Sequence, residues 1–232
     1  MNDEPMTEVA VAWDAYARTK PQRRATNATG RTSWFNWTQH PDHGPGEDLL
    51  GPRPDDRILD LGCGKGGNIA HLATLGVQAI GVDISSVQLD AARTRWGNLT
   101  TLRFCRSDAL RFLETCIERF DAIYSVFGAV WFLDPALLLP AVYDRLTPGG
   151  RFVFSHHPPT KNHYGSRPAF VHREPNRNPL TVRRWDYTAS MWRGALERHG
   201  FGDARTEVLP GPGPGQRADS GTLLVRARRP PT

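Results

Sequence analysis

Residues 57–72, RILDLGCGKGGNIAHL, place four glycines between a short apolar strand and an apolar run of helical character. Glycine weakens regular structure, so a cluster this dense predicts that a ligand comes close to the backbone here. The helix that follows would offer unpaired backbone N–H groups, which bind polar or anionic groups. We therefore interpret this turn as a binding site that includes Gly62 and Gly64.

Two carboxylates follow at the ends of later strands. Asp83 ends the second expected strand, in AIGVDIS, 23 residues after Asp60. A carboxylate in that place can accept hydrogen bonds from two ribose hydroxyls. Asp108, in FCRSDAL, ends the third expected strand and can hold an adenine amino group. Ribose and adenine together indicate an adenosyl cofactor, although each aspartate also suits a simple strand-end cap or turn.

The glycine pattern alone leaves the cofactor open. Gly62, Gly64 and Gly67 satisfy the G-x-G-x-x-G pattern of dinucleotide sites, which is weak evidence by itself. Asp60 stands two residues before the first glycine, and LTPGGRF precedes the fifth expected strand, and both features argue against NAD. A P-loop is excluded because the sequence has no G-x-x-x-x-G-K-[ST].

The order of elements predicts the fold. Short apolar strands alternate with helices from residue 57 to 156, which indicates βαβ units and a parallel sheet. A helix at 188–200 and two strands at 203–210 and 221–229 follow. We expect an α/β fold with a Rossmann-like, seven-stranded, mostly parallel sheet, helices on both faces and an antiparallel C-terminal hairpin. Residues 157–186 show little periodicity and many prolines, so we expect a long functional loop there.

Five motifs in this order carry a family resemblance: ILDLGCGKG, GVDIS, RSDAL, FDAIYS and LTPGGRFVFS. With them the chain resembles class I S-adenosylmethionine-dependent methyltransferases over about residues 57–229. The resemblance implies that S-adenosylmethionine is the cofactor and S-adenosylhomocysteine the product. DLGCGKGG also resembles the motif of mRNA cap guanine-N7 methyltransferases, but only locally.

The resemblance implies cofactor-binding roles along the carboxyl edge of the sheet. It assigns the methionine part to the first turn, the ribose to Asp83, and the adenine edge to Asp108 and Ala109. The residues implied from the core are Asp60, Gly62, Cys63, Gly64, Asp83, Ile84, Asp108, Ala109 and Ser125.

The segments outside the core are expected to determine the acceptor. In the family, the N-terminal segment and the insert after strand five close over the site, so we divide the chain into 1–56, a helix and aromatic lead-in, and 57–232, the core with a substrate loop at about 157–186. Tyr16 resembles N-terminal tyrosines that cover the cofactor. Trp37, with its aromatic neighbours, either walls the pocket or packs the lead-in against the core.

Methyl transfer needs alignment and exclusion of water, and it needs a base only where the acceptor loses a proton. His156 and His157 follow the fifth strand and point towards the expected site. An imidazole titrates near neutral pH, so these two are our candidates for the general base. A histidine at a strand end also suits a purely structural role.

The net charge of +5 comes almost entirely from arginine. Six basic residues against one acid stand between residues 156 and 185, and five basic residues without an acid between 15 and 40. These segments are either solvated surface or bind an anionic substrate or nucleic acid. The three cysteines have no metal-ligand spacing and suggest a reduced, cytoplasmic protein, with no secretory signal, membrane span or metal expected.

We therefore expect an enzyme that transfers a methyl group to a small-molecule acceptor, at oxygen or nitrogen rather than carbon, in bacterial specialised metabolism such as antibiotic biosynthesis. The alternative is an RNA or nucleotide methyltransferase that uses the arginine-rich segments. Methyltransferases of nucleobase amines carry a motif that resembles [D/N/S]-P-P-[Y/F] after the fourth strand. This chain has SVFGAVWF in that place, so nucleic acid is not the expected partner. A non-catalytic binding protein with the same fold is the third possibility, and the oligomeric state stays open.

Overall fold

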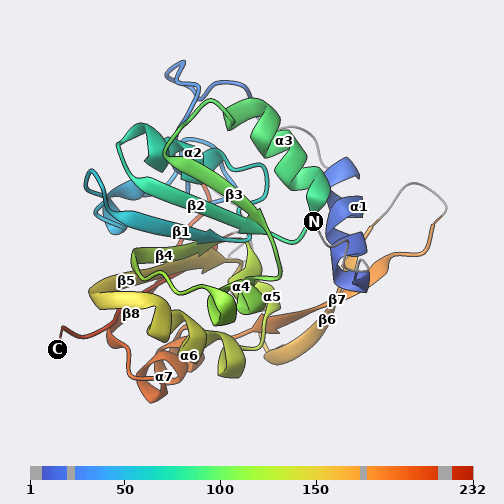
Figure 1. Cartoon of the computed structure of the whole chain (residues 1–232). Coiled ribbons are helices and arrows are strands. Elements are labelled where there is room, and N and C mark those ends of the chain that lie inside the picture. The colour runs from blue at the N-terminus through green and yellow to red at the C-terminus, as the bar shows by residue number, and fades with distance from the viewer. Residues whose placement is uncertain (1–6, 20–23, 173–176, 214–220, 232) are drawn as a thin grey trace.

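The computed structural model describes residues 7–19, 24–172, 177–213 and 221–231, and its centre is one seven-stranded sheet (Figure 1). The strand order is β3-β2-β1-β4-β5-β9-β8. The first five strands are parallel, and β9 runs antiparallel between β5 and β8. This confirms the predicted mostly parallel sheet with an antiparallel C-terminal hairpin. The strands are β1 Arg57–Leu61, β2 Gln78–Asp83, β3 Leu102–Arg106, β4 Phe120–Val126, β5 Leu146–His156, β8 Gly202–Leu209 and β9 Thr222–Arg228.

Helices cover both faces of the sheet, as expected (Figure 1). Polar side chains start several of them: Ser85 caps α3 by accepting from the Gln88 amide, and Thr188 caps α7 in the same way. No helix in the described part of the chain is long and apolar enough to cross a membrane. The helices around the sheet are α2 Gly67–Thr74 and α3 Ser86–Trp96 on one face, and α4 Ala109–Thr115, α5 Ala129–Phe132, α6 Pro135–Arg145 and α7 Ala189–Arg198 on the other.

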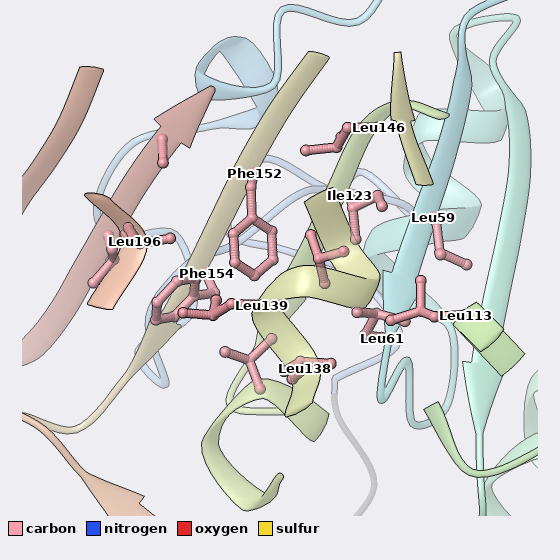
Figure 2. Packing of buried hydrophobic residues seen from close by; sticks show 14 of the residues in the cluster. Leu59, Leu61, Leu113, Ile123, Leu138, Leu139, Leu146, Phe152, Phe154 and Leu196 are labelled. Carbon is pink, nitrogen blue, oxygen red and sulfur yellow. The ribbon is translucent and has the colours of Figure 1, made fainter. Parts of the chain in front are cut away.

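The larger hydrophobic core lies on the face covered by α4, α6 and α7. Figure 2 shows side chains from β1, β4 and β5 packed against leucines of these three helices. Leu138 and Leu139 of α6 are fully buried there, because adjacent positions both fall within the inward face of an amphipathic helix. Leu137, one residue earlier, turns outwards and is 58% exposed.

The lead-in covers the opposite face. Phe35, Trp37 and Leu50 belong to a second core with residues of α2 and the sheet, including Tyr124. The Trp37 indole stands edge-on to the Tyr124 ring at 5.9 Å and donates to the Gly46 carbonyl at 2.8 Å. The Ser155 hydroxyl donates to the Trp37 carbonyl at 2.7 Å. The lead-in is therefore a structural layer that completes the core.

The expected loop at 157–186 contains a second, two-stranded sheet. β6 Gly165–Val171 and β7 Leu180–Asp186 form an antiparallel ribbon, so the prediction of an irregular loop was wrong for these residues. The alternation of apolar and polar residues that marks a strand is interrupted here, because Arg167 and Arg184 occupy inner positions of the ribbon. The ribbon packs on α1, Glu8–Thr19, through Ala12, Val171 and Val182.

We predict that Leu138→Ala lowers the free energy of unfolding by about 2–5 kcal/mol, since a buried leucine leaves both lost transfer energy and a cavity. The matched variant Leu137→Ala, on the exposed side of the same helix turn, should change it by less than about 0.5 kcal/mol. Urea unfolding followed by circular dichroism measures both. Equal losses in the two variants would contradict the packing described for α6.

Candidate active site

The carboxyl ends of the parallel strands meet at one edge of the sheet. Register places Leu61 beside Val82, and Asp83 beside Arg106. The strand order reverses between β1 and β4, and ligands bind at such a reversal in open α/β sheets. A cavity of about 650 Å3 lies there. Nine of the predicted site residues line it: Tyr16, Gly62, Cys63, Gly64, Asp83, Ile84, Asp108, Ala109 and His157.

The geometry of the turn after β1 shows what two of its glycines do. Gly62 has φ +81°, and an added Cβ would lie 2.4 Å from the Ala129 nitrogen, so only glycine fits. Gly64 has φ +54°, and an added Cβ would meet only the Gln88 side chain, at 3.9 Å. The first glycine therefore allows two backbones to touch, while the second leaves open space towards the cavity.

Asp83 is fixed by two backbone amides. Its Oδ2 accepts from the Gly64 N–H at 2.8 Å, and its Oδ1 accepts from the Ser85 N–H at 2.9 Å. Burial raises the pKa of Asp83, and these two hydrogen bonds act against that shift. The carboxylate is thus held rigidly at the cavity wall by the turn itself.

Asp108 both caps a helix and lines the cavity. It is the N-cap of α4, and its Oδ1 accepts from the Leu110 and Arg111 amides at 2.9 and 3.1 Å. The same residue lines the cavity. A cap role therefore does not remove Asp108 from the site.

Asp60 and Ser125 lie behind the site and are absent from the cavity wall. Asp60 is 3% exposed, and burial raises its pKa to about 8, while the nearby Tyr124 hydroxyl acts against the shift. The Ser125 hydroxyl donates to the Leu61 carbonyl at 2.6 Å and so ties β4 to β1. Both residues support the turn from within the core.

Trp37 requires a correction. Its side chain is fully buried in the second core, against Phe35 and Tyr124, and does not line the cavity. The aromatic residue of the N-terminal segment that does reach the cavity beside Tyr16 is Trp13, from α1. Residues three apart share a face of a helix, as Trp13 and Tyr16 do on α1, but nothing in the sequence showed that this face closes the site.

His156 also requires a correction, because it has no ring nitrogen left for a substrate. Its Nδ1 lies 2.6 Å from the His157 carbonyl and must donate, since a carbonyl only accepts. Its Nε2 accepts from the Trp192 indole N–H at 2.9 Å. Full burial lowers the pKa of His156 to about 4. This histidine is a neutral core residue.

His157 is placed differently. It lines the main cavity and a second cavity of about 570 Å3. Its Nδ1 lies 3.3 Å from the Gly221 carbonyl, so Nδ1 donates and Nε2 is the basic nitrogen. The ring stands edge-on to Phe127 at 5.0 Å and to Trp131 at 5.8 Å. Of the two candidates, only His157 can meet a ligand.

The sequence analysis missed much of the far wall. Phe127 and Trp131 line the main cavity, and Trp131 and Arg184, like His157, line both cavities. Phe127 has φ +50°, an uncommon conformation for a bulky residue, at the tip of β4. Arg184 was noted only as part of a basic segment, since nothing in the sequence marked its strand.

Comparison with known proteins agrees with this geometry. Residues 58–150 match a family described as "Methyltransferase domain". This part of the chain is therefore similar to methyltransferase domains. The structure of an S-adenosylmethionine-dependent methyltransferase from Mesorhizobium loti superposes with a TM-score of 0.59 at 25% identity, over 79% of this chain and 95% of that one.

Curated relatives match over the same core. An O-methyltransferase of Penicillium expansum is 33% identical over 110 residues, which is 46% of this chain and 40% of the relative. A trans-aconitate 2-methyltransferase of Deinococcus radiodurans is 35% identical over 104 residues, which is 44% of this chain and 38% of the relative. The aligned part of the chain thus spans about two fifths of the length of these relatives, and α7, β8 and β9 lie beyond the residues that match the family.

We predict that His156 makes stability fall in acid. Its pKa in the folded protein lies below its ordinary value, so its contribution is complete above about pH 6.5 and is lost as pH falls towards 4. The full difference is on the order of 3 kcal/mol. Urea unfolding of the wild type and of His156→Gln between pH 4 and 7.5 measures it. The free energy of unfolding should depend less steeply on pH in His156→Gln than in the wild type. The exposed control His163→Gln should show the same pH dependence as the wild type. Equal slopes for the wild type and His156→Gln would contradict the assignment.

Proposed function

We propose that the protein is an S-adenosylmethionine-dependent methyltransferase that acts on a small-molecule acceptor. The observation that carries this proposal is one continuous cavity wall formed by the Gly62–Gly64 turn, Asp83 and Asp108 at the ends of three adjacent strands. Carboxylates at the second and third strand ends suit a ribose and an adenine. The curated relatives include enzymes named for trans-aconitate and demethylmenaquinone, which are small molecules.

The residues present fit this cofactor. Open space above Gly64 leaves room for a ligand against the backbone. Ile84 and Ala109 supply apolar surface that suits an adenine, and Asp83 presents a half-buried carboxylate held by two amides. α1 covers this end with Trp13 and Tyr16. When bound, S-adenosylmethionine supplies a methyl group activated by its sulfonium.

The protein's own part in the reaction is alignment, exclusion of water and removal of a proton. Trp13, Phe127 and Trp131 line the cavity with apolar surface, which keeps water from the acceptor. We assign the removal of a proton from an acceptor hydroxyl or amine to Nε2 of His157, which packs against Phe127 and Trp131. The other imidazole on this wall, His172, is exposed. We therefore favour methylation at oxygen or nitrogen.

The size and enclosure of the site favour a small molecule over RNA. A volume of about 650 Å3 falls within the usual range of roughly 300–1,000 Å3 for small-molecule sites. The ribbon β6–β7 and α1 pack on each other and both line this cavity, which leaves less room for a polynucleotide. We extend the proposal to bacterial specialised metabolism, such as antibiotic biosynthesis, since α1 and the ribbon lie outside the residues that match the family.

We predict micromolar binding of S-adenosylmethionine and S-adenosylhomocysteine, and none of NAD, in isothermal titration. Asp83→Ala should weaken cofactor binding by at least about 2 kcal/mol, because charge-assisted hydrogen bonds to the ribose are lost. Asp90→Ala is the matched control, since Asp90 is 73% exposed on α3 and pairs only with Arg93. Its affinity should equal that of the wild type.

Binding of NAD in place of the two adenosyl compounds would overturn the proposal and favour a dehydrogenase. Unchanged affinity in Asp83→Ala would remove its ribose role while leaving the cofactor itself in place. Nucleic-acid binding is tested separately: affinity for RNA would fall steeply with salt, whereas turnover of a small acceptor would not.

We predict that His157→Ala lowers kcat by about 10²–10⁴-fold while its affinity for S-adenosylhomocysteine stays within about twofold. An acceptor screen by product mass provides the substrate for this assay. His163→Ala, in the exposed segment before the ribbon, should retain the wild-type rate. Wild-type turnover in His157→Ala would mean that alignment alone drives the transfer.

A further inference from the structure

Two arginines face each other on the inner side of the ribbon. Register places Arg167 of β6 directly opposite Arg184 of β7, and Ala169 opposite Val182 two residues further along. Residues two apart share a face of a strand, and Val182 packs towards α1, so the arginines belong to that same inner face. Like charges directly opposite each other destabilise an antiparallel pair. An anion between them would remove this cost.

Asp186 offsets only one of these charges, and it holds Arg184 in a defined orientation. The carboxylate is 2% exposed; Oδ2 accepts from the Arg184 Nε at 2.9 Å and Oδ1 from the Trp131 indole at 3.1 Å. The guanidinium carbon also lies 5.1 Å from the centre of the Trp131 ring. Asp186 is therefore a positioning residue for both side chains.

This arrangement leaves donors available. Within the described residues, nothing accepts a hydrogen bond from the two terminal nitrogens of Arg184, and Arg167 has no hydrogen-bond or ion-pair partner. A guanidinium held by its Nε presents its other edge as a fork that suits two oxygens of a carboxylate or phosphate. Arg184 lines both cavities, so this guanidinium belongs to the wall that they share.

The wall of the second cavity also carries positive charge. Its wall includes Lys161 and Thr160 from the segment after β5, together with Arg184 and His157. Its one acid is Asp186, which is already engaged by Arg184 and Trp131. The opposite end of the main cavity carries the acids Asp83 and Asp108. Charge is thus divided along the site.

We propose that the methyl acceptor carries an anionic oxygen group, a carboxylate or a phosphate, which binds to the Arg184 fork with Arg167 and Lys161 beside it. The acceptor then extends from the second cavity to His157, where its hydroxyl or amine meets the transferred methyl group. This inference rests on the proposed function, since it names the substrate class of the same site.

The test uses the full chain saturated with S-adenosylhomocysteine at constant ionic strength. The probes are benzoate, its neutral counterpart benzamide, and inorganic phosphate, each followed by protein-observed NMR titration. Benzoate should bind at least about tenfold more tightly than benzamide, and Arg184→Gln should remove that preference. Arg167→Gln should weaken the binding of benzoate at least about threefold, and it breaks no hydrogen bond or ion pair among the described residues. Arg183→Gln, the outward-facing neighbour on the same strand that bonds Ser166, should bind as the wild type does.

Competition by inorganic phosphate at the same resonances would assign the site to oxyanions in general, and its absence to carboxylates. Three results would overturn the proposal. Benzoate and benzamide bind with equal affinity, none of the three probes binds, or Arg183→Gln loses as much affinity for benzoate as Arg184→Gln does. Affinity for S-adenosylhomocysteine is measured first. A protein that binds it without a preference for anions keeps the proposed function and loses only this inference.

Discussion

The contact between the turn after β1 and the turn after β4 is the constraint on which the site depends. A Cβ on Gly62 would lie 2.4 Å from the Ala129 nitrogen, and one on Gly128 would lie 2.6 Å from the Leu61 carbonyl. Ser125 ties the same carbonyl to β4 through its hydroxyl. Because two backbones touch here, the turns cannot shift independently. The space above them is the cavity, and the register of β2 and β3 then determines where Asp83 and Asp108 stand.

α1 is joined to this arrangement through its Asp14 carboxylate, which accepts from the Ser85 and Ser86 hydroxyls. The Ser85 hydroxyl donates to the Asp14 carboxylate of α1 at 2.5 Å, and the Ser85 amide donates to Asp83 at 2.9 Å. Asp14 also accepts from the Val87 amide at the start of α3. The helix that covers the cofactor end is therefore fixed to the residue that holds the expected ribose. Covering and binding at this end share one hydrogen-bond chain, and the ribbon packs on α1 through apolar side chains.

The sequence predicted what local chemistry determines. The β1 turn was recognisable because its glycines stand between an apolar strand and a helix. The ribbon was not recognisable, since Arg167 and Arg184 occupy inner positions where a strand pattern needs apolar residues. The two adjacent histidines could not be told apart either. Their roles diverge only because Trp192, 36 residues later, supplies an indole N–H to the first.

Charge separation along the cavity gives the two ends different tasks. Carboxylates at the sheet edge disfavour an anion beside the cofactor, and the guanidinium on the ribbon disfavours a cation at the other end. The two ends also come from different parts of the chain: the strand turns of the core supply the acids, and the addition after β5 supplies the arginines. Substitutions in the ribbon can therefore change the acceptor without disturbing the contact between Gly62 and Gly128. The proposed contacts to the acceptor therefore lie on the inner face of β6 and β7, apart from the glycine turn that would hold the cofactor.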